Sequence, residues 1–234
     1  RMLAWLTLLA LLLAGEWLMR DSENEGWLTA EKQPELLRAL HVLRLVGPWL
    51  LIWPVCTRFF AHLLGLDAPG RVSLLGLGDA VNATEWARYL TAWVMMGIIA
   101  AVLVRARAER WPTTPISAWY RHVLLPIWVT VCIAVVIVWN FTQDGSMRPL
   151  PYLPILNPID LTTGFAARLA LWTYRLLDGD NERLWEIKPY VSAITALAVY
   201  AWFNLMLLRS AAQYLDIDYT FVALFRSQFV QAML

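Results

Sequence analysis

The stretch Met147–Leu177 reads M-R-P-L-P-Y-L-P-I-L-N-P-I-D-L-T-T-G-F-A-A-R-L-A-L-W-T-Y-R-L-L and joins a proline-rich segment to an apolar one. Proline lacks a backbone donor and disfavours helix in the residue before it, so the first part is predicted to be extended. The apolar part is predicted to be a helix. Asn157 can cap it, Pro158 fits its first position, and Asp160 lies in its first turn, where the helix dipole favours an anion.

This predicted helix carries charges on one face. Asp160, Gly164 and Arg168 are spaced four residues apart, and residues at this spacing are neighbours on a helix surface. An ordered loop that leads into a helix with charges on one face is the most site-like feature of the sequence. We therefore predict a functional site in this stretch.

The composition indicates a membrane protein. Hydrophobic residues make up 59% of the chain and charged residues 16%, whereas soluble domains have about 45–50% and about 25%. The chain also contains 14 tryptophans, and tryptophan is enriched at membrane–water interfaces.

Several chemistries find no support in the sequence. Cys56 and Cys132 lie in apolar segments, which argues against a disulfide framework or a zinc site. A net charge of +1 without a basic run indicates no nucleic-acid partner. No nucleophile, zinc-protease or phosphate-loop motif occurs, so no cofactor is predicted. Asp216 and Asp218 could hold a metal ion on the outer face, but two acids in a polar connector are more often solvated, so no metal is predicted.

We expect an all-α polytopic bundle with six spans in a single membrane domain, residues 1–234. A spanning helix needs about 20 mostly apolar residues. The predicted spans are residues 2–19, 45–66, 86–104, 118–141, 158–177 and 189–208.

The second predicted span has unusual features. Before it, Arg38, His41 and Arg44 recur at helical spacing, which predicts an amphipathic helix that lies at the interface or leads into the span. Inside it, Gly47-Pro48 and Pro54 predict a kinked or re-entrant helix.

Both ends of the chain are typical of a fragment. The chain starts at Arg1 and stops at Leu234 inside an apolar run that resembles the start of another span. We therefore expect a fragment of a longer polytopic protein.

Basic residues predict the orientation. The connectors at 20–38, 105–121 and 175–188 carry ten Lys and Arg residues, and those at 67–88, 142–157 and 209–226 carry five. Because cytoplasmic loops are enriched in Lys and Arg, the first set is expected in the cytoplasm. The proline-rich segment is then expected on the outer side.

Ionisable groups at membrane depth are costly and are therefore functional candidates. Together with Asn157, they predict a polar substrate path made of Arg58, His62, Asn157, Asp160 and Arg168. Asn157 and Arg168 are expected to point into the bundle, because exposing them to lipid is costly. The alternative is structural: Glu16 would pair with Arg58 or Arg168, or the charged groups would extend to the interface.

Three segments carry a resemblance to a known family. They are PYLPILNPIDL at 151–161, WFNLMLLR at 202–209 and SQFVQAML at 227–234. They resemble the C-terminal region of a large bacterial multi-spanning family, domain of unknown function 2339, and the match covers about residues 149–234. The resemblance implies an integral protein of the bacterial inner membrane and cell envelope, and it brings no reaction. Family members usually have a histidine shortly after the arginine that matches Arg209. Ala212 and Gln213 stand there instead, so no role of that histidine is carried over.

Three functions remain open. The first is transport or handling of a lipid or glycan envelope substrate, based on the broken second span and the intramembrane charges. The second is an envelope glycosyl or acyl transferase that uses Asp160, Asp216 or Asp218. The third is a non-catalytic membrane subunit or scaffold. Membrane lipids and other membrane subunits are the expected partners.

Overall fold

The computed structural model describes residues 2–27, 29, 31–64, 84–147, 150–178, 184–227 and 230–231. Within these residues every regular element is a helix, which confirms the predicted all-α class. The elements are α1 (Met2–Asn24), α2 (Pro34–Leu63), α3 (Thr84–Arg107), α4 (Ser117–Trp119), the π-helical turn η1 (Tyr120–Leu124), α5 (Leu125–Thr142), α6 (Pro158–Asp178), α7 (Leu184–Leu215) and α8 (Phe221–Arg226).

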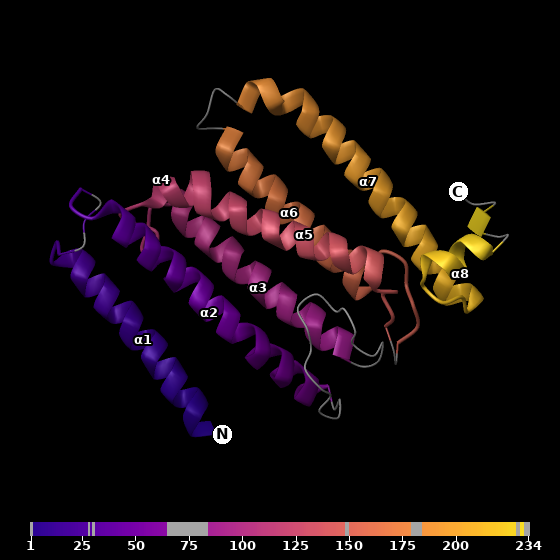
Figure 1. The fold of residues 1–234 in the computed structure, drawn as a ribbon, viewed down its shortest axis with the longest axis horizontal. Coiled ribbons are helices and arrows are strands. Elements are labelled where there is room, and N and C mark those ends of the chain that lie inside the picture. Colours follow the sequence, from indigo (N-terminus) through magenta and orange to yellow (C-terminus); the bar gives the residue numbers. More distant parts are fainter. Residues whose placement is uncertain are drawn as a thin grey trace.

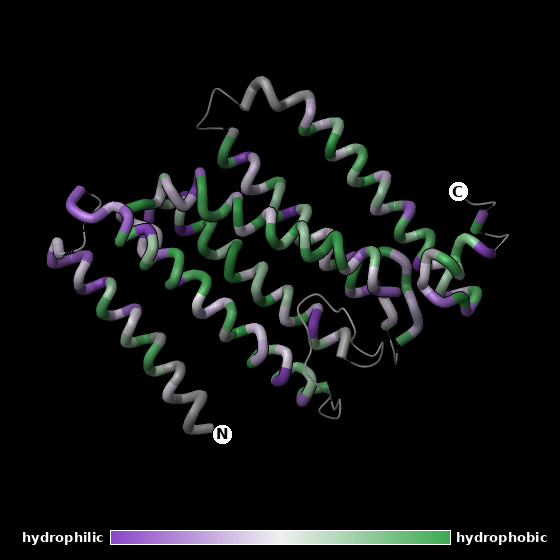
Figure 2. The backbone as a smooth tube through the Cα atoms, viewed as in Figure 1, coloured by the Kyte–Doolittle hydropathy of each residue, from purple (hydrophilic) through white to green (hydrophobic). Residues whose placement is uncertain are grey.

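The long helices run alternately in opposite directions, side by side (Figure 1). Helices α3, α5 and α6 form the centre, α2 packs on α3, and α1 and α7 are the outermost helices. The central core contains Ile99 and Leu103 of α3, Leu125 and Val129 of α5, and Leu169 of α6. Apolar residues dominate the middle of the helices, and hydrophilic residues gather toward the connecting ends (Figure 2).

Four helical segments in the described part of the chain are long and apolar enough to cross a membrane. They are Pro34–Leu63, Trp86–Arg107, Ser117–Thr142 and Tyr190–Leu215. This finding fits a membrane protein in general. The predicted count of six spans stays a prediction, because α6 is not among the four and several side chains of α1 lie outside the described residues.

Helix α2 is continuous, which corrects the re-entrant alternative for the second predicted span, whereas the kink stays a prediction. It is one helix of 30 residues that continues through Pro48 and Pro54. The amphipathic stretch around His41 is its first part and therefore leads into the span. Each proline removes one hydrogen bond, which membrane helices tolerate when neighbouring groups satisfy the freed carbonyl.

The fourth predicted span is continuous, but it contains a π-helical turn, Tyr120–Leu124, directly before Pro126. The amide of Leu125 donates to the carbonyl of Tyr120, five residues earlier. Because Pro126 has no amide hydrogen, the regular α-helical ladder is already interrupted at this point, and the wider turn lies where that bond is missing.

Helix α7 corrects the expected end of the sixth span. It reaches Leu215, so Arg209 lies inside a helix and not in a polar connector. The reason is that residues 209–215 are mostly helix-compatible and follow the apolar segment without a glycine or proline.

The predicted orientation assigns five basic residues to the outer side. The long helices alternate in direction, so successive helix ends alternate between the two ends of the bundle, as the count of basic residues assumes (Figure 1). Arg88 and Arg209, two of the five basic residues assigned to the outer side, are buried. Arg71 and Arg148 lie outside the described residues. The orientation therefore stays a prediction.

Candidate functional site

The proline-rich segment ends at Asn157, which caps α6 as predicted. Its Oδ1 atom accepts a hydrogen bond from the amide of Asp160 at 2.9 Å, and its carbonyl accepts one from the amide of Leu161 at 3.1 Å. Asn157 is fully buried, which confirms the expectation that it points into the bundle. The cap fixes the start of α6 and the position of the Asp160 carboxylate.

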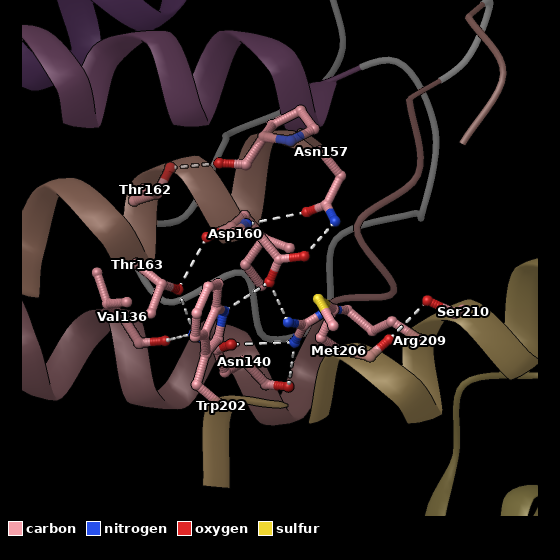
Figure 3. A network of polar contacts seen from close by, with 12 residues as sticks. Val136, Asn140, Asn157, Asp160, Thr162, Thr163, Trp202, Met206, Arg209 and Ser210 are labelled. Atoms are coloured by element: carbon pink, nitrogen blue, oxygen red, sulfur yellow. Dashed lines mark hydrogen bonds and ion pairs between the residues drawn. The ribbon is translucent and has the colours of Figure 1, made fainter. Parts of the chain in front are cut away.

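The Asp160 carboxylate is buried and has three donors around it (Figure 3). Oδ1 accepts from the Arg209 guanidinium and, at 2.9 Å, from the indole N–H of Trp202. Oδ2 accepts from the side-chain amide of Asn157. Both side chains of the Asp160–Arg209 ion pair are 0% exposed. The negative charge is thus fully compensated within the protein.

Asn140 extends the network from α6 and α7 to α5. Its Oδ1 accepts from Nη1 of Arg209 at 3.0 Å, and its Nδ2 donates to Thr163 at 2.9 Å. Its carbonyl accepts from the hydroxyl of Tyr219 at 2.9 Å. Burial raises the pKa of Tyr219, with Arg209 acting in the opposite direction. The network therefore fastens the end of α7 to α5 and α6.

The backbone before α6 comes close to this network. Gly145 has a φ of +70°, and a Cβ atom there would lie 2.9 Å from a side-chain carbon of Ile159 and 3.3 Å from Oδ1 of Asn157. Glycine is needed on both counts, because other residues are strained at positive φ and would also collide here. Nearby, the hydroxyl of Tyr214 donates to the carbonyl of Tyr152 at 3.0 Å.

The network around Asp160 fixes α7 to α5 and α6, and it is not arranged for acid–base chemistry. Three donors occupy the Asp160 carboxylate, so it is not available to a substrate or a metal ion. A buried pair of this kind is strongly destabilised when one partner is removed. Sequence reasoning missed Arg209, which hydropathy alone assigned to a connector.

The predicted polar path is not assembled in the structure. Arg58 and His62 are exposed in the last two turns of α2, and Asn157 and Asp160 belong to the buried network. Arg168 is exposed on α6, so the expectation that it points into the bundle is wrong. The partner of Asp160 is Arg209.

Arg168 instead lines a cavity of about 310 Å³ between α3 and α6. The lining residues are Arg107, Arg168, Leu171, Trp172, Arg175 and Leu176. Three arginines, with no carboxylate among the described lining residues, make this hollow strongly basic. Sequence spacing could have indicated part of it, since residues 168, 172 and 175 share one helix face.

A second polar cluster joins α1 to α2. The Nε atom of Arg44 donates to both carboxylate oxygens of Glu16, at 2.7 and 2.8 Å. The expected pairing of Glu16 with Arg58 or Arg168 is therefore wrong.

His41 belongs to the same cluster and is fully buried. Its Nδ1 lies 2.8 Å from the hydroxyl of Tyr120, and its Nε2 lies 3.2 Å from Oε1 of Glu23. The cluster links the ends of α1 and α2 to the π-helical turn, and sequence reasoning did not anticipate it.

Asp216 and Asp218 are exposed after the end of α7. Within the described ranges, no three His, Cys, Asp or Glu side chains come together in a way that could hold a metal ion. The chain matches no family model, and no curated protein or solved structure matches it. The resemblance of residues 149–234 to domain of unknown function 2339 therefore stays a prediction.

Proposed function

We propose that this chain is a non-catalytic membrane subunit of the bacterial cell envelope, in which α7 docks a transmembrane helix of another polypeptide. One observation carries the proposal: residues 192–201 of α7 are all exposed. Ten consecutive residues cover every direction around a helix of 3.6 residues per turn. Along this segment, α7 is therefore uncovered both on the side that faces the bundle and on the outer side of the helix.

The composition of this segment supports a protein occupant. It contains Ser192, Thr195 and four alanines among larger apolar residues. Membrane helices associate through small residues that let backbones approach closely, and through hydroxyl groups. The exposed Ile194, Leu197 and Tyr200 would then fill the spaces between the helices.

The buried network supports the same proposal from the other end of α7. Arg209 and Trp202 attach the C-terminal part of the helix to Asp160. The exposed residues 192–201 precede this attachment along α7.

The two other hypotheses have less support. A transferase that uses Asp160 would need this carboxylate free, and three donors occupy it. The other two candidates, Asp216 and Asp218, are exposed after the end of α7. A transport path through the five predicted residues would need them to converge, and they lie in separate places. Handling of a lipid is supported by one feature, the basic cavity near Arg168.

Site-specific photo-crosslinking tests the proposal. A photoreactive amino acid at Ala196 of the complete protein is expected to give a discrete protein adduct in intact membranes. The same amino acid at Ile137, which is exposed on α5, serves as the matched control and should give lipid adducts. Lipid adducts alone at both positions would contradict the proposal.

A size measurement provides the second test. We expect Ala196→Trp to shift the native complex in mild detergent to a smaller size, because the bulky side chain prevents close helix approach. Ile137→Trp should leave the size unchanged.

A further inference from the structure

We propose that the basic cavity between α3 and α6 binds a phosphate group, presented by the headgroup of an anionic membrane lipid. The cavity is lined by Arg107, Arg168, Arg175 and Trp172 together with two leucines. The inference does not depend on the docking role of α7, because the two features lie on different residues.

Charge is the first argument. Three guanidinium groups surround one hollow, and the described residues that line it include no carboxylate. Among the side chains that the structure describes, which do not include those of residues 178–189, no acidic group forms an ion pair with any of the three arginines. Like charges that are close together repel one another, and a bound anion removes that repulsion. Arginine offers a planar pair of donors that matches phosphate oxygens.

Position is the second argument, and it separates Arg168 from its neighbours. Arg107 is the last residue of α3, and Arg175 lies in the last turn of α6, where a cation also offsets the helix dipole. Arg168 lies in the middle of α6 and has no such role. Arg168 is exposed beside two other arginines, and an anion bound there would stabilise its guanidinium group.

Shape and polarity identify the ligand as part of an amphiphile. A hollow of about 310 Å³ is at the lower end of the range for small-molecule sites, roughly 300–1,000 Å³. It suits a headgroup and not a whole lipid. Leu171 and Leu176 provide an apolar wall beside the arginines, and Trp172 is of the residue type that sits at the headgroup level. Basic pockets between membrane helices on the cytoplasmic side bind anionic lipid headgroups in this manner.

Native mass spectrometry of the complete protein tests the proposal. The protein is exchanged into detergent with equal amounts of cardiolipin, phosphatidylglycerol and phosphatidylcholine, and the retained lipids are counted. We expect selective retention of an anionic lipid. Arg168→Gln should weaken retention about tenfold or more, because one charge-assisted contact is lost. Arg168→Lys should retain part of it.

The matched control is Arg110→Gln, which removes an exposed arginine at the same end of the bundle but outside the cavity. It should leave retention unchanged. A parallel titration with inorganic phosphate separates the two sources of the ligand. Weak competition supports a lipid headgroup, and displacement at low phosphate concentration would show that the cavity takes a free phosphate compound, which overturns the assignment to lipid. Equal retention of all three lipids, or equal effects of the Arg168 and Arg110 variants, would overturn the site itself.

Discussion

Replacing Asp160 by asparagine is the sharpest test of the buried network. The change keeps the volume of the side chain and removes the charge that compensates Arg209. We expect the protein to be strongly destabilised. In contrast, an exposed acid such as Asp218, changed in the same way, should have almost no effect on stability.

The magnitude follows from the three donors around Asp160. Arg209 and Trp202 donate to Oδ1, and Asn157 donates to Oδ2. An asparagine has one acceptor oxygen, so its amide group must face a donor on one side. Losing a hydrogen bond to a charged group costs roughly 1.5–3 kcal/mol, and removing one member of a buried ion pair costs about 3–5 kcal/mol. We therefore expect a loss of about 3–5 kcal/mol for Asp160→Asn, which is a factor of a hundred or more in the folding equilibrium.

The assay compares protein level in the membrane fraction with the midpoint of thermal aggregation in detergent. Asp160→Asn and Arg209→Gln should each lower both quantities. The double variant should be less impaired than the sum of the two, because the second change removes the uncompensated charge. A silent Asp160→Asn variant, or strictly additive effects, would refute the structural role of the pair. Normal stability combined with lost cellular function would instead assign Asp160 to a site.

Three further predictions concern other parts of the fold. Gly145→Ala should destabilise the protein by at least about 1 kcal/mol, because residue 145 has a positive φ and the added Cβ atom would lie 2.9 Å from Ile159. The control Gly47→Ala lies inside a helix with open space around it and should be neutral or slightly stabilising in the same thermal assay. A cysteine at Ser146 should react with an impermeant reagent in intact cells, and one at Ala108 should not; labelling at 108 would refute the orientation. Burial raises the pKa of Tyr219 in the folded protein, so its contribution to the free energy of unfolding is present below the unfolded pKa of about 10 and is lost as the pH rises through the folded pKa. Tyr219→Phe should therefore reduce the loss of thermal stability between about pH 9 and 12. An unchanged dependence of stability on pH would contradict this assignment.

Local signals along the chain were predictable from the sequence. The start of α6 is predicted by Asn157, Pro158 and Asp160, and the structure places all three at the positions that capping requires. These signals act within one turn of a helix, so neighbouring residues are sufficient to recognise them. The apolar segments likewise predict the helices, because length and composition decide them.

Contacts between helices were not predictable in the same way. The spacing places Asp160 and Arg168 on one helix face, but the ion-pair partner of Asp160 lies on α7, 49 residues away. A single sequence does not show which faces of two helices meet. Glu16 and Arg44 illustrate the missing information. Glu16 lies eight residues before the end of α1, and Arg44 lies ten residues after the start of α2. A turn joins these two helix ends, and antiparallel neighbours bring such positions together.

The separation of Asp160 and Arg209 has a consequence for biogenesis. The ribosome makes about 5–20 residues per second, and 49 residues separate the two partners, so Arg209 follows Asp160 by roughly 2–10 s. During this interval Asp160 lacks its ion-pair partner. A truncated polypeptide that stops before Arg209 never gains it. Closure of the pair therefore depends on synthesis of α7, and a chain that stops earlier carries the cost of a buried acid without its partner.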